Sequence, residues 1–471
     1  MPFTLHASRA IRAALFVAAL TAIVAALAVV RPPATPGPLA RDFEAYYAAG
    51  QAWVRHQNPY GPEIWQYERA VPGVDGQRYE FLPFVGPPYG LPLWALFAQL
   101  PFALAVTIWE TLLVAAAVVS IRACATLAGA RAGVREFVML VPIAFAFAPL
   151  MSAMALGQVA LLSLAAMFVA MLLVENAVLP AAVALFMAAL QPNVTLAFVA
   201  YLRRTNAVRA TIFAGLAALS VALIVAPRTG NGWSYLRLLG EHGGAEKADV
   251  IQITPAAILA GLGLAPSAAG ALGLLLTITV VLATIAALAR RRTYDPVLAA
   301  ALVCAATPFI VPFFHEHDLI VLLLPIMYCT LRLRGSAALA GAFSSVLVAI
   351  DWLGLAQRPS GLIQSALLAF AFAVVIAQQS REPRALFFAL APLVLLIALG
   401  ALAQAHPAPI WPDALPRSFT PPHASAAVIW EAEQRATGLL APNPFWALLR
   451  ACSLAGCAGL WLALTWAPKR R

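Results

Sequence analysis

Charged side chains are scarce in this sequence. Asp, Glu, Lys and Arg together make up only 11% of the 471 residues, and 62% of the residues are apolar. An average soluble domain has about 25% charged residues, so the shortage excludes a soluble globular protein, and the apolar excess excludes an intrinsically disordered one. Cysteine is also rare. The five cysteines lie in or beside apolar runs, so we expect neither a disulfide framework nor a cysteine metal site.

Long apolar runs take the place of the missing charge. Stretches of about 20 apolar residues, the length that crosses a bilayer as a helix, recur along almost the whole chain. Leu15 to Val30 and Ala271 to Leu288 are apolar on every face, whereas the strands of a membrane barrel alternate apolar and polar residues. The sequence therefore predicts an all-α polytopic membrane protein with about 12–14 transmembrane helices. The expected spans lie near 13–30, 92–121, 136–155, 158–174, 177–190, 192–202, 209–227, 268–289, 296–313, 319–332, 336–354, 361–379, 385–404 and 445–467. The first run is long for a signal peptide, so we expect it to be retained as a helix.

Basic residues occur in small clusters between these runs. With a cytoplasmic N-terminus, about fourteen crossings place every cluster and the C-terminus on the cytoplasmic side of the cell membrane, as the positive-inside rule requires. The net charge of +10 therefore indicates topology and not nucleic-acid binding. The clusters are Arg9/Arg12, Arg122/Arg131/Arg135, Arg203/Arg204/Arg209, Arg290/Arg291/Arg292, Arg332/Arg334, Arg381/Arg384 and Lys469/Arg470/Arg471.

One stretch decides this topology. Residues 177–202 have the length of a single span, but a single crossing would put the next arginine clusters outside. We therefore divide the stretch at Gln191-Pro192-Asn193 into two short helices. Helices this short cannot cross about 30 Å of hydrocarbon alone, so they must be buried against protein or line a cavity. A single helix over 177–202 remains the alternative.

Three polar segments then lie outside the cell membrane, near 31–91, 228–267 and 405–444. The cytoplasmic loops are too short to form a site, so we expect the extracytoplasmic loops to carry it. We divide the chain into a transmembrane module that should carry the site, 1–335, and a group of C-terminal transmembrane helices, 336–471.

Five short motifs follow one another along the first 325 residues. They are Asp42-Phe43-Glu44-Ala45-Tyr46-Tyr47 with Asn58-Pro59-Tyr60, Phe81-Leu82-Pro83-Phe84 with Pro87-Pro88, Leu156-Gly157-Gln158-Val159, Gln191-Pro192-Asn193, and His315-Glu316-His317-Asp318 before Leu322-Leu323-Leu324-Pro325. In this order and spacing the sequence resembles glycosyltransferase family 87, polytopic membrane enzymes of the GT-C superfamily. It departs from the family in having Ala160 where members often have Asn, and Gln191 where they often have Lys.

The resemblance implies a GT-C-like fold and an α-mannosyltransferase-like activity. Such an enzyme transfers a sugar, a mannose-like hexose or a pentose, from a polyprenyl-phosphate donor to a lipid or glycan acceptor of the cell envelope. The transfer takes place on the extracytoplasmic face, inverts the anomeric centre and uses an aspartate as general base. The expected partners are this donor, the acceptor and the lipid bilayer, with no nucleic acid. No cofactor is expected.

Asp42 is the candidate general base, because it is the first carboxylate after the first span and GT-C enzymes carry their catalytic aspartate at this place. Its alternative role is to cap the helix that follows it. Glu44 is the nearest rival and a candidate substrate-binding residue, although two positions along a helix it points elsewhere.

The other candidates are polar residues near the ends of spans. The His315 to Asp318 motif must line a cavity or cap helices, and His317 and His315 are candidate contacts for the donor phosphate or the acceptor. A metal is not expected, because residues two apart on a helix diverge and ligation would need an extended turn. Arg237 is the preferred cation for phosphate, with Arg228 and Lys247 as alternatives. Gln158 and Asn193 can bind sugar or phosphate, or can equally make helix–helix contacts.

A secondary transporter or lipid flippase is the alternative function. Transporters place ionisable groups near the bilayer midplane and often consist of two repeated halves. Here the candidate carboxylates gather at one face and we find no repeat, which favours the glycosyltransferase.

Overall fold

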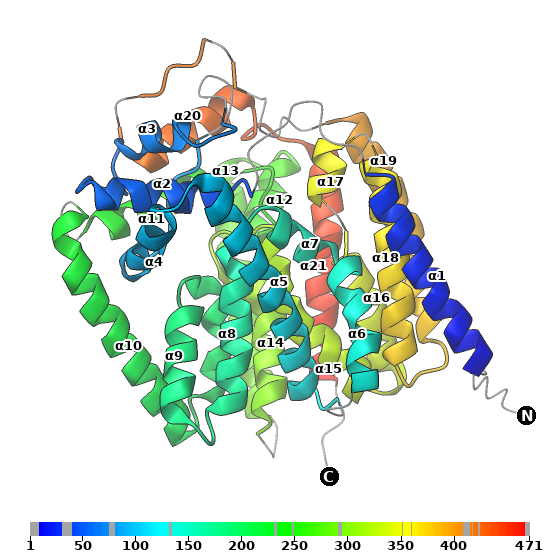
Figure 1. The fold of residues 1–471 in the computed structure, drawn as a ribbon. Coiled ribbons are helices and arrows are strands. Elements are labelled where there is room, and N and C mark those ends of the chain that lie inside the picture. The colour runs from blue at the N-terminus through cyan, green and yellow to red at the C-terminus, as the bar shows by residue number, and fades with distance from the viewer. Residues whose placement is uncertain are drawn as a thin grey trace, which may run out of the picture.

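The structure is a computed structural model that describes residues 9–30, 40–74, 81–130, 134–229, 233–246, 249–290, 294–350, 352–358, 360–407, 415–416, 418–422 and 424–466. Over these residues it is a bundle of helices without a strand (Figure 1). The α-helices are α1 (Arg9–Ala28), α2 (Phe43–Val54), α3 (Ile64–Arg69), α4 (Leu91–Phe97), α5 (Phe102–Leu127), α6 (Val134–Ala146), α7 (Ala148–Ala155), α8 (Val159–Leu173), α9 (Val178–Ala188), α10 (Thr205–Val225), α11 (Ser234–Ala245), α12 (Pro255–Gly261), α13 (Pro266–Ala289), α14 (Pro296–Ile310), α15 (Leu323–Arg332), α16 (Gly335–Leu347), α17 (Trp352–Gln357), α18 (Gly361–Gln379), α19 (Ala385–Ala405), α20 (Ala426–Thr437) and α21 (Pro444–Thr465). The 3₁₀ helices are η1 (Pro88–Gly90), η2 (Pro192–Tyr201), η3 (Ala226–Arg228) and η5 (His317–Leu322).

Seven helices in the described part of the chain are long and apolar enough to cross a membrane, or eight if the bent pair α7 and α8 counts as one. They are α1, α5, α10 with η3, α13, α18, α19 and α21. The all-α polytopic class predicted from the sequence is therefore confirmed.

The remaining expected spans correspond to shorter helices. Helix α9 has 11 residues and α16 has 13, which gives lengths of roughly 17 and 20 Å at 1.5 Å per residue. Such helices cannot cross a bilayer alone, so the number of full-length spans is smaller than the 12–14 expected. The expected span at 92–121 also begins too early. The chain breaks at Pro101, which precedes α5 in an extended conformation, because proline cannot donate a helical hydrogen bond and disfavours helix in the residue before it.

Residues 178–201 form a hairpin, as we expected from placing all the arginine clusters on one side of the membrane. Helix α9 runs to Ala188, and after Gln191 the chain returns as η2. Asn206, at the start of α10, donates a hydrogen bond to the carbonyl of Glu175, just before α9, over 3.0 Å. One helix over 177–202 would place these two residues at opposite sides of the bundle, so the single-helix alternative is wrong.

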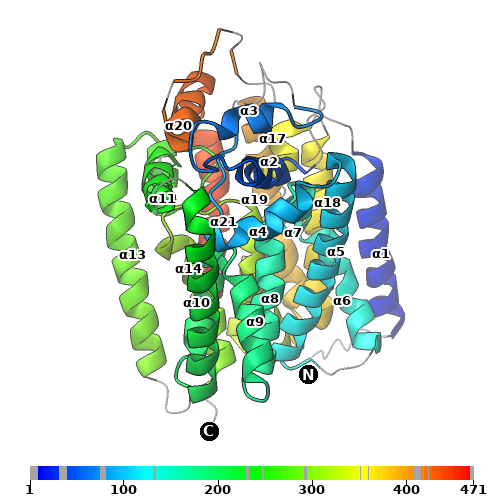
Figure 2. The same ribbon diagram turned by 60° about the vertical axis from the view of Figure 1, so that its left-hand side comes forward.

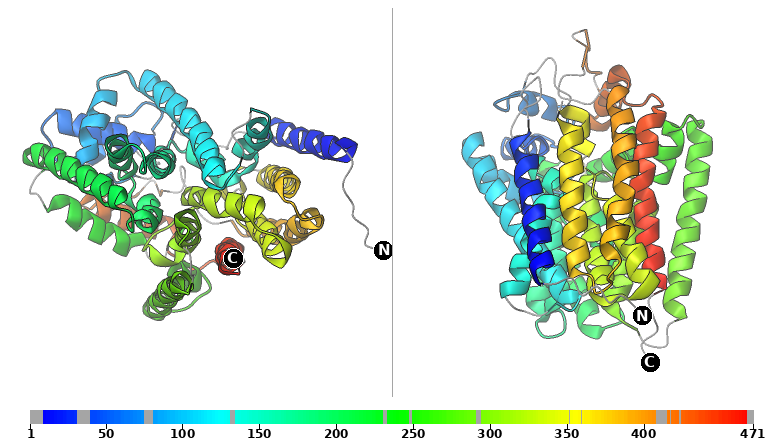
Figure 3. Two further views of the ribbon diagram at one scale, coloured as in Figure 1. Left: turned by 90° about the horizontal axis from the view of Figure 1, so that it is seen from below. Right: turned by 90° about the vertical axis from the view of Figure 1, so that its right-hand side faces the viewer.

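The bundle has two different ends. At one end, which we call the loop end, lie α2, α3, α11, α17 and α20 (Figures 1 and 2). At the other, the basic end, lie the start of α1 and the ends of α5, α13 and α21 (Figures 1 and 3). Those cluster arginines that the structure describes, such as Arg204, Arg290 and Arg332, lie near helix boundaries at the basic end.

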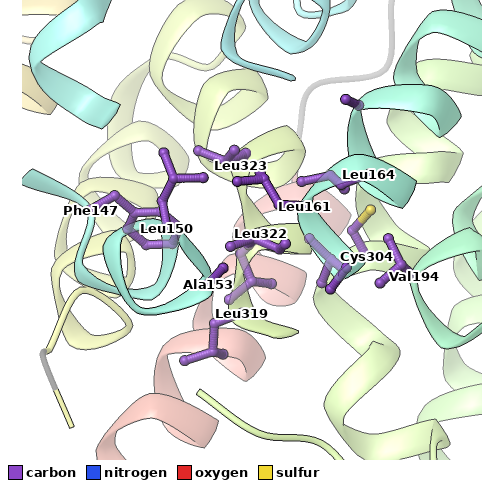
Figure 4. Close-up of a cluster of buried hydrophobic side chains, with 14 of the residues drawn as sticks. Phe147, Leu150, Ala153, Leu161, Leu164, Val194, Cys304, Leu319, Leu322 and Leu323 are labelled. Carbon is purple, nitrogen blue, oxygen red and sulfur yellow. The ribbon is translucent and has the colours of Figure 1, made fainter. Parts of the chain in front are cut away.

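The centre of the bundle is apolar and closely packed. Phe147, Leu150 and Ala153 from the α6–α7 region meet Leu161 and Leu164 of α8, and both groups face the leucines that lead from η5 into α15 (Figure 4). Within a bilayer, close van der Waals packing and small residues hold helices together. This packed layer fixes the turns that emerge from it toward the loop end.

One of these turns, Leu156-Gly157-Gln158, joins α7 to α8, which are bent by 120° from each other. The Leu156 carbonyl accepts the backbone N–H of Asp42 (2.8 Å), and the Gly157 carbonyl accepts the indole N–H of Trp109 (2.7 Å). Gly157 has φ +73°, and a Cβ there would lie 2.8 Å from the Cβ of Ala40. Only glycine allows both this backbone conformation and this close approach.

We therefore expect Gly157→Ala to destabilise the protein by about 1–3 kcal/mol, through strain at positive φ and the clash with the start of α2. The measurement is thermal unfolding of the purified protein in detergent. Gly240→Ala is the matched control, because Gly240 is helical and has no atom within 4 Å of an added Cβ, so its melting temperature should stay level or rise. Equal melting temperatures for both variants would remove the role given to this turn.

We also expect reporter fusions at Gly61 and Arg204 to lie on opposite sides of the membrane, Gly61 outside and Arg204 inside. The reason is that one pass precedes Gly61, whereas the hairpin of α9 and η2 returns the chain to the basic end before Arg204. A paired phosphatase and fluorescent-protein fusion assay measures this. An extracytoplasmic signal at Arg204 would contradict the topology.

Candidate functional site

A cavity of about 170 Å³ opens among the segments of the loop end. It is lined by the start of α2, residues 82–85, the α7–α8 turn, the tip of the α9–η2 hairpin, α11, the turn before η5, and the C-terminal helices. Its polar lining residues are Asp42, Gln158, Gln191, His242, Glu246, His315, Glu316, His317 and Asp318. Residues from distant parts of the sequence thus meet in one space.

Asp42 stands at the start of α2, but its side chain makes no capping hydrogen bond. The capping role left open by the sequence is therefore wrong. Instead the carboxylate accepts a hydrogen bond from Nε2 of Gln158. Burial raises the pKa of Asp42 to about 6, although Arg41 and the bond from Gln158 act to lower it. A carboxylate with this pKa is largely ionised at neutral pH and can still accept a proton.

His315 and His317 lie on the turn between α14 and η5. Because only His317 belongs to the 3₁₀ helix, the two rings do not diverge as on an α-helix but stack with their centroids 5.2 Å apart. The backbone N–H of His315 donates to Oδ2 of Asp318 over 3.0 Å, which closes the turn. Burial lowers the pKa of His317 to about 4 and raises that of Asp318 to about 6.

Helix α11 and the residue that follows it supply two cavity residues that the sequence interpretation missed, His242 and Glu246. His242 Nε2 lies 3.1 Å from Glu246 Oε1, and His315 Nε2 lies 3.4 Å from Glu246 Oε2. Burial acts to raise the pKa of Glu246, but His242 and His315 outweigh it and lower the pKa to about 2. Leu238, His242 and Glu246 recur every four residues, so a search for a buried helix face would have found them.

Gln252 connects these groups. Its Oε1 accepts the backbone N–H of Phe314 (2.6 Å), which makes its amide nitrogen the donor toward Glu246 and toward His315 Nε2, 2.8 Å away. The Gln252 carbonyl is in turn held by Nη1 of buried Arg450 over 2.6 Å. A helix near the C-terminus therefore fixes the loop that orients the histidines.

The tip of the hairpin reaches this cluster. Gln191 lines the cavity. The Asn193 amide lies close enough to Asp318 to oppose the rise in the pKa of that carboxyl, although no hydrogen bond of normal geometry joins them. The structure thus brings Asp42, Gln158, His315 and His317 to one cavity and places Asn193 directly beside it.

Two candidates do not reach the cavity. Glu44 is fully buried in an ion pair with Arg41, which also lies 3.9 Å from Glu68, so Glu44 helps to fix α2 and does not line the site. Arg237 is exposed on α11 and outside the lining, because five helical positions separate it from His242. The substrate-binding roles expected for Glu44 and Arg237 are therefore not supported.

The alternative cations are not part of the lining either. Arg228 is exposed and lies 5.2 Å from the Trp53 ring, and Lys247 is outside the described residues. The lining of the cavity, as far as the structure describes the chain, contains four carboxylates and no Lys or Arg. Because the described lining is acidic, an anionic substrate would need a positive charge that these side chains do not supply.

Aromatic side chains cover the cavity. Trp430 of α20, Trp446 of α21, Tyr46 and Phe313 all line it, so residues after 336 contribute to the site that the sequence assigned to 1–335 alone. Three buried atoms of lining residues, Asp318 Oδ1, His242 Nδ1 and Trp430 Nε1, make no hydrogen bond within the described structure. Such atoms are available to a polar ligand.

Residues 84–313, just under half of the chain, match the model of glycosyltransferase family 87. This match agrees with the resemblance found in the sequence, and membership of that family implies a membrane glycosyltransferase. Neither a curated protein nor a solved structure matches the chain. The match begins after Asp42 and ends before His315, so it does not test the roles of these residues.

Proposed function

We propose that this membrane glycosyltransferase transfers a sugar from a polyprenyl-phosphate donor to a hydroxyl group of a lipid or glycan acceptor on the extracytoplasmic face. The observation that carries the proposal is the carboxylate of Asp42, which faces a cavity at the loop end, is held by Gln158 and is not used as a helix cap.

The reaction is a single displacement. The acceptor hydroxyl gives its proton to Asp42 as its oxygen forms a bond to the anomeric carbon. The bond from that carbon to the phosphate oxygen breaks at the same time, and polyprenyl phosphate leaves with the electron pair. The anomeric configuration is inverted, and no covalent enzyme intermediate forms. A base with a pKa near the working pH is suited to this proton transfer.

The form of the cavity supports this chemistry. Tyr46, Trp430 and Trp446 offer flat faces for a sugar ring, and aromatic side chains combine an apolar body with a polar edge. Leu82, Pro83 and Val85 give an apolar flank toward which a lipid chain can extend. A transporter would hold its ionisable groups at midplane, whereas here they gather at one end of the bundle.

We expect Asp42→Asn to lower the rate of sugar transfer by roughly 10²- to 10⁴-fold. The asparagine carbonyl can still accept the bond from Gln158, so the fold should survive while the base is lost. The assay incubates purified protein with labelled polyprenyl-phosphate hexose or pentose and membrane extract, and detects a new glycolipid or glycan. Melting temperature is measured beside it.

Glu63→Gln is the matched control, because it removes an exposed carboxylate of the same extracytoplasmic segment and should leave turnover nearly unchanged. A folded Asp42→Asn protein with wild-type turnover would overturn the assignment of the base.

The pH dependence gives an independent test. Since the ionised form of Asp42 is the active one, turnover should fall as the pH drops through about 6, the pKa of this carboxyl. Gln158→Leu removes a hydrogen bond that lowers this pKa, so the acidic limb of the profile should shift to higher pH. The profile of kcat/KM against pH measures the shift.

Gln191→Leu is the control for this experiment. It removes the same amide from the same cavity without touching Asp42, so it can weaken binding but should keep the midpoint of the acidic limb. If Gln158→Leu also keeps that midpoint, the bond to Gln158 does not tune the base.

A further inference from the structure

The proposed chemistry raises an electrostatic problem in this cavity. The donor phosphate is anionic, and negative charge builds up on it as the sugar leaves, so it needs a positive charge nearby. The part of the lining that the structure describes offers no Lys or Arg and contains four carboxylates. The inference below rests on the proposed function, because it concerns the phosphate of that donor.

The turn before η5 presents a compact set of metal-binding groups. His315, His317 and Asp318 each offer one ligand atom, and these atoms lie within 4.8 Å of one another. His317 Nε2 is 3.9 Å from Asp318 Oδ1. Two ligands at metal distances of about 2.0–2.2 Å can be at most roughly 4.3 Å apart. This pair therefore already has a separation that one cation can bridge.

Asp318 supplies an independent observation. Its side chain is 2% exposed, yet Oδ1 accepts no hydrogen bond of normal geometry from the described residues, although the Asn193 amide lies close to this carboxyl, while Oδ2 accepts the backbone N–H of His315. A buried carboxylate oxygen without a donor is energetically costly unless a ligand satisfies it. The fixed Oδ2 leaves Oδ1 for that ligand.

Glu246 provides the support that a metal-binding histidine usually has. His315 Nε2 lies 3.4 Å from Glu246 Oε2, and Glu246 is held from its other side by His242. In the present arrangement His315 Nε2 accepts a hydrogen bond from the Gln252 amide. Binding of a cation at Nδ1 would move the ring proton to Nε2, which would then donate to Glu246 in place of accepting from Gln252. A carboxylate in this position fixes the ring and increases its basicity as a ligand.

We propose that His315, His317 and Asp318 bind a divalent transition-metal cation, of the Zn²⁺ or Mn²⁺ type, whose open position takes a phosphate oxygen of the donor. Two imidazole nitrogens and one carboxylate suit such cations better than Mg²⁺ or Ca²⁺, which prefer ligands made of oxygen alone. The sequence argued against a metal because residues two apart diverge on a helix. That objection does not apply, since the observed turn brings both rings together.

The test measures metal binding directly. The full-length protein is purified in detergent, stripped with a chelator and titrated with Mn²⁺, and free Mn²⁺ is followed by electron paramagnetic resonance. We expect one bound Mn²⁺ per chain and at least tenfold weaker binding in His317→Ala and in Asp318→Asn. Zn²⁺ should compete for the same site.

His56→Asn is the matched control, because His56 is an exposed histidine at the loop end with φ +59°, a conformation that asparagine tolerates. It should bind Mn²⁺ as the wild type does. Pulsed resonance on the wild type alone should show coupling of Mn²⁺ to imidazole nitrogen, which keeps the test valid if a variant fails to fold.

Failure of the metal site and failure of the proposed function give different results. A wild type that binds no Mn²⁺ or Zn²⁺, binding without nitrogen coupling, or binding that is equal in folded site variants and the control would overturn the metal site. Sugar transfer that continues in excess chelator would also overturn it and leave the proposed function intact. A protein that binds the metal but transfers no sugar from any polyprenyl-phosphate donor would instead refute the proposed function.

Discussion

The site depends on how the start of α2 is held against the turn between α7 and α8. Two bonds join them, from the Asp42 backbone to Leu156 and from Gln158 to the Asp42 carboxylate. Glycine at 157 permits the approach, and Trp109 of α5 fixes the turn from the other side. The same few atoms therefore set the position, the orientation and the basicity of Asp42, so the local fold and the chemistry cannot be separated here.

Most of the fold could be predicted because a lipid bilayer requires long apolar helices and favours basic residues on one side of the membrane. Long apolar runs and arginine clusters gave the order of the helices, and the requirement for a consistent topology gave the hairpin of α9 and η2. The rules say less about where a helix breaks within an apolar stretch. The break at Pro101, and the small number of full-length spans, depend on which short helices are surrounded by protein, and that is a property of tertiary packing.

The candidate site was predictable only in part, for a related reason. Asp42, His315 and His317 stand out as polar residues at the ends of apolar runs. His242 and Glu246 lie in the segment 228–267, where polar residues are common, so only their four-residue spacing from Leu238 distinguishes them, and their partners are distant in sequence. Arg237 was preferred for its charge, but charge does not determine which face of a helix is buried. The acidity of the cavity emerges only when separate loops are brought together.

The contact between the two ends of the chain has a consequence for biogenesis. Glu433 of α20 accepts the backbone N–H of Phe81 over 2.6 Å and pairs with Arg69 at 3.2 Å. These bonds cannot form until α20 has been synthesised. The segment that carries Asp42 therefore stays uncovered while the helices between it and α20 are inserted. Until then the half-built cavity is an open acidic surface at the loop end, and its closure by α20 and α21 completes the cavity.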